Sequence, residues 1–142
     1  MVASGRSVGL WALTAWAAMV VGGLTAGWTG EARAAYTTQD AASDCTDFFY
    51  YTASDALASD YGGDTQTSAY YALLCAYYAD LYLTQGRATQ NQVDFYYATI
   101  YNYYGYYYAY ESFNARPTTK TYNASLWGYY AFSYTYNAYA DF

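Results

Sequence analysis

The chain has 142 residues, of which 24 are tyrosine and none is histidine, and its formal net charge is −6. This length fits one domain, and the lack of histidine removes the commonest general base and metal ligand. An acidic chain without a basic cluster is a poor partner for nucleic acid. We therefore expect a non-enzymatic protein with no catalytic residues, no metal, no cofactor and no nucleic-acid partner.

Residues 1–34 are expected to be a secretory signal peptide. A short n-region with Arg6 precedes an apolar stretch, Val8–Trp28, and an Ala-Arg-Ala pattern at 32–34 follows it. Because roughly 20 apolar residues can span a bilayer, an uncleaved N-terminal membrane anchor is the alternative. Cleavage would make the protein secreted, periplasmic or attached to the cell surface.

The remaining chain is divided into an N-terminal arm, residues 35–42, and a helical tyrosine-rich domain, residues 43–142. Ala69–Tyr82 is the segment on which the helical prediction rests. Its small residues recur at three- and four-residue steps, which places them on one stripe of an α-helix. Similar rows of small residues accompany three other tyrosine pairs, at 50–51, 96–97 and 129–130. Four copies at unequal spacing predict an all-α bundle of about four similar helices.

Capping residues and glycines suggest where these helices begin and end. The first expected helix runs from a cap at Ser43 or Asp44 to about Ser59, and the second from a cap at Asp64 or Thr65 to Gly86. The third begins at a capping box, Thr89–Gln92, and ends at about Tyr110. The fourth begins at Thr121. The segment Asn114–Lys120, which contains the chain's one proline, is expected to be a loop.

The last segment, residues 121–142, has two interpretations. All of its polar residues fall at odd positions, which is the period-two pattern of a β-strand. Its small residues Gly128, Ala131, Thr135 and Ala138 reproduce the helical row of the second copy, so helix is favoured. The strand interpretation, together with the terminal Phe142, also supports an outer-membrane β-barrel as an alternative.

Cys45 and Cys75 are the only cysteines. In an exported chain an even pair suggests a disulfide, and the glycine-containing turn near residue 62 lies midway between them. A helical hairpin folded at that turn would bring the two together, so we expect a Cys45–Cys75 disulfide that staples the hairpin. Two buried free thiols are the alternative.

Two aspartates, Asp47 and Asp94, each precede an aromatic run, and a carboxylate pair can perform acid–base chemistry. Both are interpreted instead as residues in the first turn of a helix.

The tyrosine content exceeds what a small core needs, so some rings must face outward. The third helix has tyrosines all around it, and its expected interaction surface consists of Tyr96, Tyr97, Tyr103, Tyr104, Tyr106, Tyr107 and Tyr108. The composition favours a secreted structural protein that associates with itself or with cell-envelope material through aromatic helix faces. A carbohydrate- or small-ligand-binding module is the alternative, and a membrane partner is expected only if the leader is retained.

Overall fold

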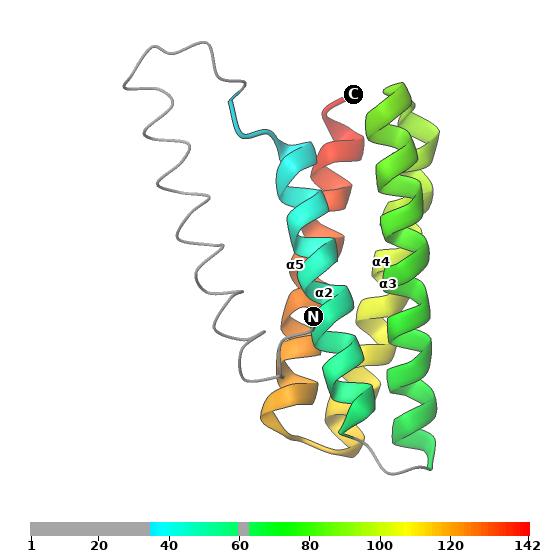
Figure 1. The fold of residues 1–142 in the computed structure, drawn as a ribbon, viewed down its shortest axis with the longest axis vertical. Coiled ribbons are helices and arrows are strands. Elements are labelled where there is room, and N and C mark those ends of the chain that lie inside the picture. The colour runs from blue at the N-terminus through cyan, green and yellow to red at the C-terminus, as the bar shows by residue number, and fades with distance from the viewer. Residues whose placement is uncertain (1–34, 60–62) are drawn as a thin grey trace.

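In the computed structural model, the described residues, 35–59 and 63–142, form four α-helices and no strand. The helices are α2 (Thr38–Ala58), α3 (Asp64–Thr89), α4 (Gln92–Ala115) and α5 (Thr119–Ala140). They form an up-and-down bundle in which α2 and α4 each contact both α3 and α5 (Figure 1). The predicted all-α bundle is confirmed, and the expected signal peptide lies outside the described residues.

The core of the bundle is built mainly from small side chains. Each helix turns a row of residues spaced three and four apart toward the centre, and most of these are alanine, glycine, serine or threonine. On α3 the buried row is Ala69, Ala72, Ala76, Ala79, Leu83 and Gly86. On α5 it is Thr121, Ala124, Gly128, Ala131, Thr135 and Ala138. The predicted small-residue stripes therefore face the core.

Phe49 of α2 is the largest ring that is fully enclosed at the centre, and two glycines make room for it. A Cβ atom added at Gly105 of α4 would lie 2.6 Å from Cε2 of Phe49, and one added at Gly128 of α5 would lie 3.0 Å from Cε1. Both distances are too short for a methyl group against a ring. The two glycines thus let α4 and α5 close around Phe49.

One buried polar contact joins three helices near the middle of the bundle. The amide nitrogen Nδ2 of Asn102 on α4 donates to Oγ1 of Thr46 on α2 at 2.9 Å and to Oγ1 of Thr135 on α5 at 2.8 Å. All three side chains are fully buried. Because a buried polar group needs its partners, this contact favours one register of α2, α4 and α5.

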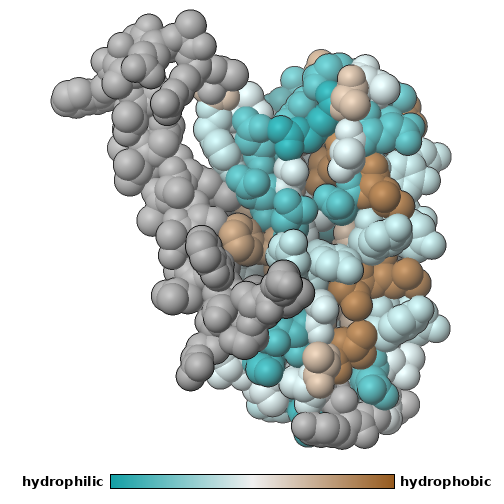
Figure 2. Space-filling model, viewed as in Figure 1, coloured by the Kyte–Doolittle hydropathy of each residue, from teal (hydrophilic) through white to brown (hydrophobic). Residues whose placement is uncertain are grey.

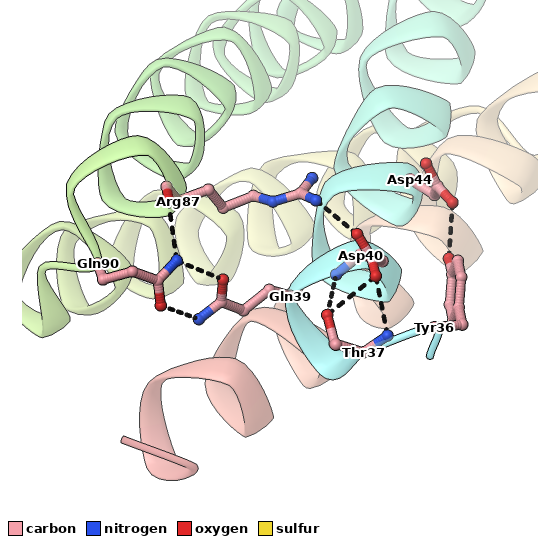
Figure 3. Close-up of polar contacts among 7 residues, drawn as sticks. All are labelled: Tyr36, Thr37, Gln39, Asp40, Asp44, Arg87 and Gln90. Carbon is pink, nitrogen blue, oxygen red and sulfur yellow. Dashed lines mark hydrogen bonds and ion pairs between the residues drawn. The ribbon is translucent and has the colours of Figure 1, made fainter. Parts of the chain in front are cut away.

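The first helix begins earlier than predicted, at Thr38 rather than after Ser43. Thr37 and Asp40 form the capping box that starts it: Oγ1 of Thr37 accepts from the backbone N–H of Asp40, and the Asp40 carboxylate accepts from that of Thr37 (Figure 3). Asp44, expected as a cap, instead accepts a hydrogen bond from the hydroxyl of Tyr36 at 2.6 Å. Most of the expected arm therefore belongs to α2.

The other predicted boundaries differ from the observed ones by up to five residues. Gly86 was expected to end α3, but it lies inside that helix, where an added Cβ would be 3.1 Å from the ring of Phe95. The left-handed residue that follows α3 is Gln90, with φ 50°. Asn91 caps α4, which continues past Tyr110 to Ala115. Gly86 is thus a packing glycine.

The C-terminal segment is a helix, as the small-residue row predicts, and the strand interpretation of residues 121–142 is wrong. Thr118 and Thr121 form a capping box at the start of α5. The polar residues at odd positions do not form a solvent-exposed face, because Thr121, Ser125 and Thr135 are buried. Threonine and serine here fill small core sites, and the Thr135 hydroxyl donates to the backbone carbonyl of Ala131.

The predicted Cys45–Cys75 disulfide is wrong: both thiols are free. Two contacts, Asp40 with Arg87 and Asp47 with Asp80, show which residues of α2 and α3 lie side by side. In this register Cys45 lies level with Tyr82, two helical turns from Cys75. Cys75 also faces a different neighbour, since its Cβ would be 3.2 Å from a Cβ added at Gly105 of α4. Burial raises the pKa of the Cys45 thiol to about 12 and that of Cys75 to about 11.

Candidate functional site

The tyrosines occupy the edges of the helices, beside the small core residues. On α4 the core positions are Phe95, Ala98, Asn102, Gly105 and Ala109, and tyrosine follows at most positions between them. This arrangement repeats every seven residues, which keeps each set of positions on one side of a packed helix. The same repeat therefore places tyrosines in rows along both boundaries of α4.

The first row lies along the boundary of α3 and α4, and we call it the α3–α4 ladder. Its members are Tyr71, Tyr78 and Tyr82 of α3 and Tyr97, Tyr101 and Tyr108 of α4. Each rung pairs rings from the two helices: the centroids are 5.3 Å apart in Tyr71–Tyr108, 5.4 Å in Tyr78–Tyr101 and 5.3 Å in Tyr82–Tyr97. The ring planes in these rungs meet at 31–36°, and Tyr82 also stacks on Tyr101 at 14°.

The second row lies along the boundary of α4 and α5, and we call it the α4–α5 ladder. Its ring pairs are Tyr96–Tyr139, Tyr103–Phe132, Tyr106–Tyr129 and Phe113–Tyr122. Their centroids are 5.3–5.7 Å apart, but their planes meet at the steeper angles of 54–66°. Pairs of this kind contribute roughly 0.5–1.5 kcal/mol each beyond burial, so both ladders join neighbouring helices.

The seven tyrosines expected as an interaction surface all lie on α4, and five of them belong to the two ladders. Tyr97 and Tyr108 face α3, whereas Tyr96, Tyr103 and Tyr106 face α5. Tyr107 is exposed, and a hydrogen bond from its hydroxyl to Glu111 raises its pKa. Tyr104 is exposed as well. These residues are thus arranged around α4, with the neighbouring helices completing each row.

The partners of these tyrosines on α3 and α5 were not among the predicted site residues. On α5 they are Tyr129, Phe132 and Tyr139. A signal was present in the sequence: tyrosines recur seven apart at 71 and 78, at 97 and 104, at 101 and 108, and at 122, 129 and 136. Seven-residue spacing indicates one side of a packed helix.

Charge is distributed unevenly around the bundle. Residues 95–110 and 121–140, which include most of α4 and nearly all of α5, contain no charged side chain. By contrast, α2 carries Asp40, Asp44, Asp47 and Asp55. The bundle therefore has an uncharged aromatic side, formed by α4 and α5, and an acidic side, formed by α2 with its boundary to α3.

Hydrophilic residues gather at one end of the bundle, where α2 begins and α5 ends (Figure 2), and several of them contact one another. Arg87 of α3 pairs with Asp40 of α2, and the side-chain amides of Gln39 and Gln90 exchange two hydrogen bonds of 3.1 Å (Figure 3). Gln92 of α4 donates to the backbone carbonyl of Tyr139 on α5 at 3.2 Å. These contacts thus join α2 to α3 and α4 to α5 at this end.

A small groove opens on the acidic side, between α2 and α3. It has a volume of about 220 Å³ and is lined by Asp47, Tyr50, Tyr51, Tyr77 and Asp80. Asp47 stands in the middle of α2 and not in its first turn, so its predicted position is wrong, whereas Asp94 does lie in the first turn of α4.

The two carboxyl groups of the groove lie close enough to form a hydrogen bond when one of them carries a proton. Partial burial raises the pKa of Asp47 to about 7, and the charge of Asp80, the hydrogen bond that protonated Asp47 donates to it and the charge of Asp44 add to the increase. Arg87 opposes the increase. Near neutral pH the groove therefore carries an incompletely ionised carboxyl pair between tyrosine rings.

Within residues 35–59 and 63–142, no helix combines the length and the apolar character that crossing a membrane requires. The same residues contain no group of three or more acidic or cysteine side chains placed to hold a metal ion. Comparisons with models of protein families, with curated proteins and with solved structures give no match.

Proposed function

We propose that the protein is an exported structural component that self-associates through the uncharged tyrosine side formed by α4 and α5. The observation that carries the proposal is the coincidence of two features on these helices: exposed tyrosines are abundant, and residues 95–110 and 121–140 lack charge. The partner that fits best is a second copy of the chain.

Electrostatics favour this side over the others for contact between copies. Residues 35–142 hold ten acidic and three basic side chains, so two copies repel each other wherever their acidic surfaces meet. Contact through α4 and α5 keeps those surfaces apart. Tyrosine is also enriched in interfaces, because it contributes a large ring at low entropic cost and keeps its hydroxyl hydrated.

The exposed tyrosine surface of α4 and α5 is similar in area to a stable protein interface. Nine tyrosines of α4 and α5 are each about half exposed, namely Tyr96, Tyr97, Tyr103, Tyr104, Tyr107, Tyr110, Tyr122, Tyr129 and Tyr136. At roughly 100 Å² of exposed surface for each half-exposed ring, they present about 900 Å² together, slightly more than the about 800 Å² that each partner buries in a standard stable interface.

The test is light scattering coupled to size exclusion on the wild type and two double variants. Tyr129→Glu with Tyr136→Glu places two charges on the aromatic side, and Tyr51→Glu with Tyr70→Glu places two on α2 and α3 at similarly exposed positions. We expect oligomers for the wild type and the second variant and a folded monomer for the first. A monomeric wild type, or oligomers of unchanged size in the first variant, would contradict the proposal.

Export is tested separately, by mass spectrometry of the protein recovered from a host that secretes it. We expect a chain beginning at Ala35. A chain that keeps residues 1–34 and stays with the membrane fraction would replace export with anchoring.

The groove between α2 and α3 favours a second candidate function, binding of a carbohydrate or another small ligand. Its tyrosine rings offer apolar surfaces and its two carboxyl groups can accept hydrogen bonds from hydroxyls. A panel of glycans is tested for an increase in melting temperature, with Asp47→Asn plus Asp80→Asn as the control. A response that the control loses supports this function, and no response across the panel rejects it.

A further inference from the structure

We propose that the α3–α4 ladder is a site of oxidative cross-linking, in which tyrosines of α3 and α4 become joined by carbon–carbon bonds within one molecule. The pairs are Tyr71 with Tyr108, Tyr78 with Tyr101, and Tyr82 with Tyr97 or Tyr101. This inference concerns bonds inside one chain and does not depend on self-association.

The chemistry requires a one-electron oxidant, such as a peroxidase that reduces hydrogen peroxide to water. Each of two phenols loses one electron and one proton and becomes a phenoxyl radical. The two radicals form a bond between ring carbons ortho to their oxygens, and each ortho hydrogen then moves to oxygen as the rings regain aromaticity. The product has lost two hydrogen atoms, and the oxidant has gained two electrons.

Ring geometry singles out this ladder. The new bond requires overlap of p orbitals on two ortho carbons, and this overlap is best when the ring planes are close to parallel. Planes in the α3–α4 rungs meet at 31–36°, and those of Tyr82 and Tyr101 at 14°. The tyrosine pairs of the α4–α5 ladder are nearly as close, with centroids 5.7 Å apart, but their planes meet at 54° and 66°.

Access to the oxidant favours the same pairs. In each of the three rungs at least one ring is exposed: Tyr71, Tyr78 and Tyr97 are 44%, 39% and 44% exposed. Every rung joins two helices that already pack together, so the radicals meet without rearrangement of the backbone.

Cys75 lies in this boundary too, and because a thiol can reduce a phenoxyl radical, the test uses Cys75→Ala as its background.

The chain offers a direct way to assign the bonds. Trypsin cleaves after Arg87 and Lys120 but not between Arg116 and Pro117. Nearly all of α3 therefore lies on the peptide that ends at Arg87, while α4 lies on residues 88–120 and α5 on residues 121–142. A bond across the α3–α4 boundary joins the first two peptides, and one across the α4–α5 boundary joins the last two.

The experiment is photo-oxidation of the purified protein by a ruthenium tris-bipyridyl complex with persulfate, followed by a denaturing gel. Only the monomer band is digested, so bonds between copies are excluded. We expect dityrosine fluorescence in that band and a joined pair of peptides, residues 88–120 with the peptide ending at Arg87, two hydrogens lighter than their sum. A monomer band without joined peptides, or one in which 88–120 is joined as often to 121–142, would overturn the proposal.

Two matched variants keep every ring but remove three phenols each. Tyr71→Phe, Tyr78→Phe and Tyr82→Phe together should reduce the dityrosine fluorescence of the monomer band several-fold. Tyr129→Phe, Tyr136→Phe and Tyr139→Phe together should leave most of it. Equal losses in the two variants would show that ring geometry does not select the site, which would also overturn the proposal.

Discussion

Aromatic rings are few in the interior of the bundle and abundant on its outer surface. Inside, alanine, glycine, serine and threonine predominate, and Phe49 and Phe95 are the two aromatic rings with no exposed surface. Outside, tyrosines stand in rows along the helix boundaries, many of them about half exposed. Small core residues let the backbones approach closely, so the rings have room only at the edges. The comparison teaches that stability and surface chemistry depend on different rings of the same chain.

The same comparison separates two kinds of boundary between helices. Charged and polar groups meet where α2 packs on α3, as in the Asp40–Arg87 and Asp47–Asp80 contacts. Tyrosine rings meet along the α3–α4 ladder. A change of pH should therefore act on the first boundary, and oxidation of tyrosine on the α3–α4 ladder.

The largest expected effect comes from the enclosed ring of Phe49. Phe49→Ala should lower the free energy of unfolding by about 3–5 kcal/mol, because it removes buried apolar surface and leaves a cavity. Urea denaturation followed by circular dichroism measures the change. Tyr51→Ala, at an exposed neighbouring position, is the control. If both variants lose the same free energy of unfolding, inner and outer rings contribute equally to stability, which would contradict the prediction.

Gly105→Ala tests the space that Phe49 occupies. Alanine raises helix propensity by about 1 kcal/mol over glycine, but the added methyl group would lie 2.6 Å from the Phe49 ring. Overpacking of this kind costs about 1–3 kcal/mol, so we expect net destabilisation. In a Phe49→Leu background the same substitution should cost less. A Gly105→Ala protein more stable than the wild type would contradict this packing.

The carboxyl pair of the groove predicts a dependence on pH. The pKa of Asp47 is raised from 3.8 in the unfolded chain to about 7 in the folded one. Its contribution to stability is therefore fully present below about pH 4 and is lost as the pH rises through about 7. Because Asp47 is only partly buried and keeps contact with water, solvent screens the repulsion and limits the effect to about 1 kcal/mol.

Asp47→Asn should remove this dependence and stabilise the protein at pH 8 relative to the wild type. The free energies of unfolding of the two proteins are compared at pH 5 and pH 8, and Asp80→Asn is the companion variant. If the two proteins differ by the same amount at both pH values, the carboxyl groups do not share a proton.

The smallest effect is expected at Tyr107, one of the exposed rings of α4. Tyr107→Ser should change the free energy of unfolding by no more than about 0.5 kcal/mol, since Tyr107 is exposed and lies outside the core. Thermal unfolding of a monomeric preparation measures it. A loss above about 1 kcal/mol would assign surface tyrosines a structural role.

The sequence alone predicts the helices and the faces that they bury, because small residues at three- and four-residue steps are a local pattern. The row Gly128, Ala131, Thr135 and Ala138 correctly outweighed the polar alternation of the last segment. The mistakes concern features that depend on neighbouring helices. Gly86 resembled a helix end, but the ring of Phe95 explains it, and Cys75 faces α4 instead of Cys45.

The ladders were predicted only in part, for the same reason. Tyrosines on all sides of the third helix indicated rings outside the core. Their pairing depends on the register between helices, which the buried Asn102 and the glycines beside Phe49 help to set. Neither contact can be recognised before the helices are placed side by side.

Trp127 gives the bundle a built-in optical reporter. It is the only tryptophan after residue 28, it is buried, and its ring contacts those of Phe48 and Tyr130. Light absorbed by the surrounding tyrosines can pass to this single indole by resonance energy transfer while the helices stay packed. In a chain of residues 35–142, emission of the folded bundle should therefore come mainly from Trp127, and unfolding should restore the shorter-wavelength emission of tyrosine.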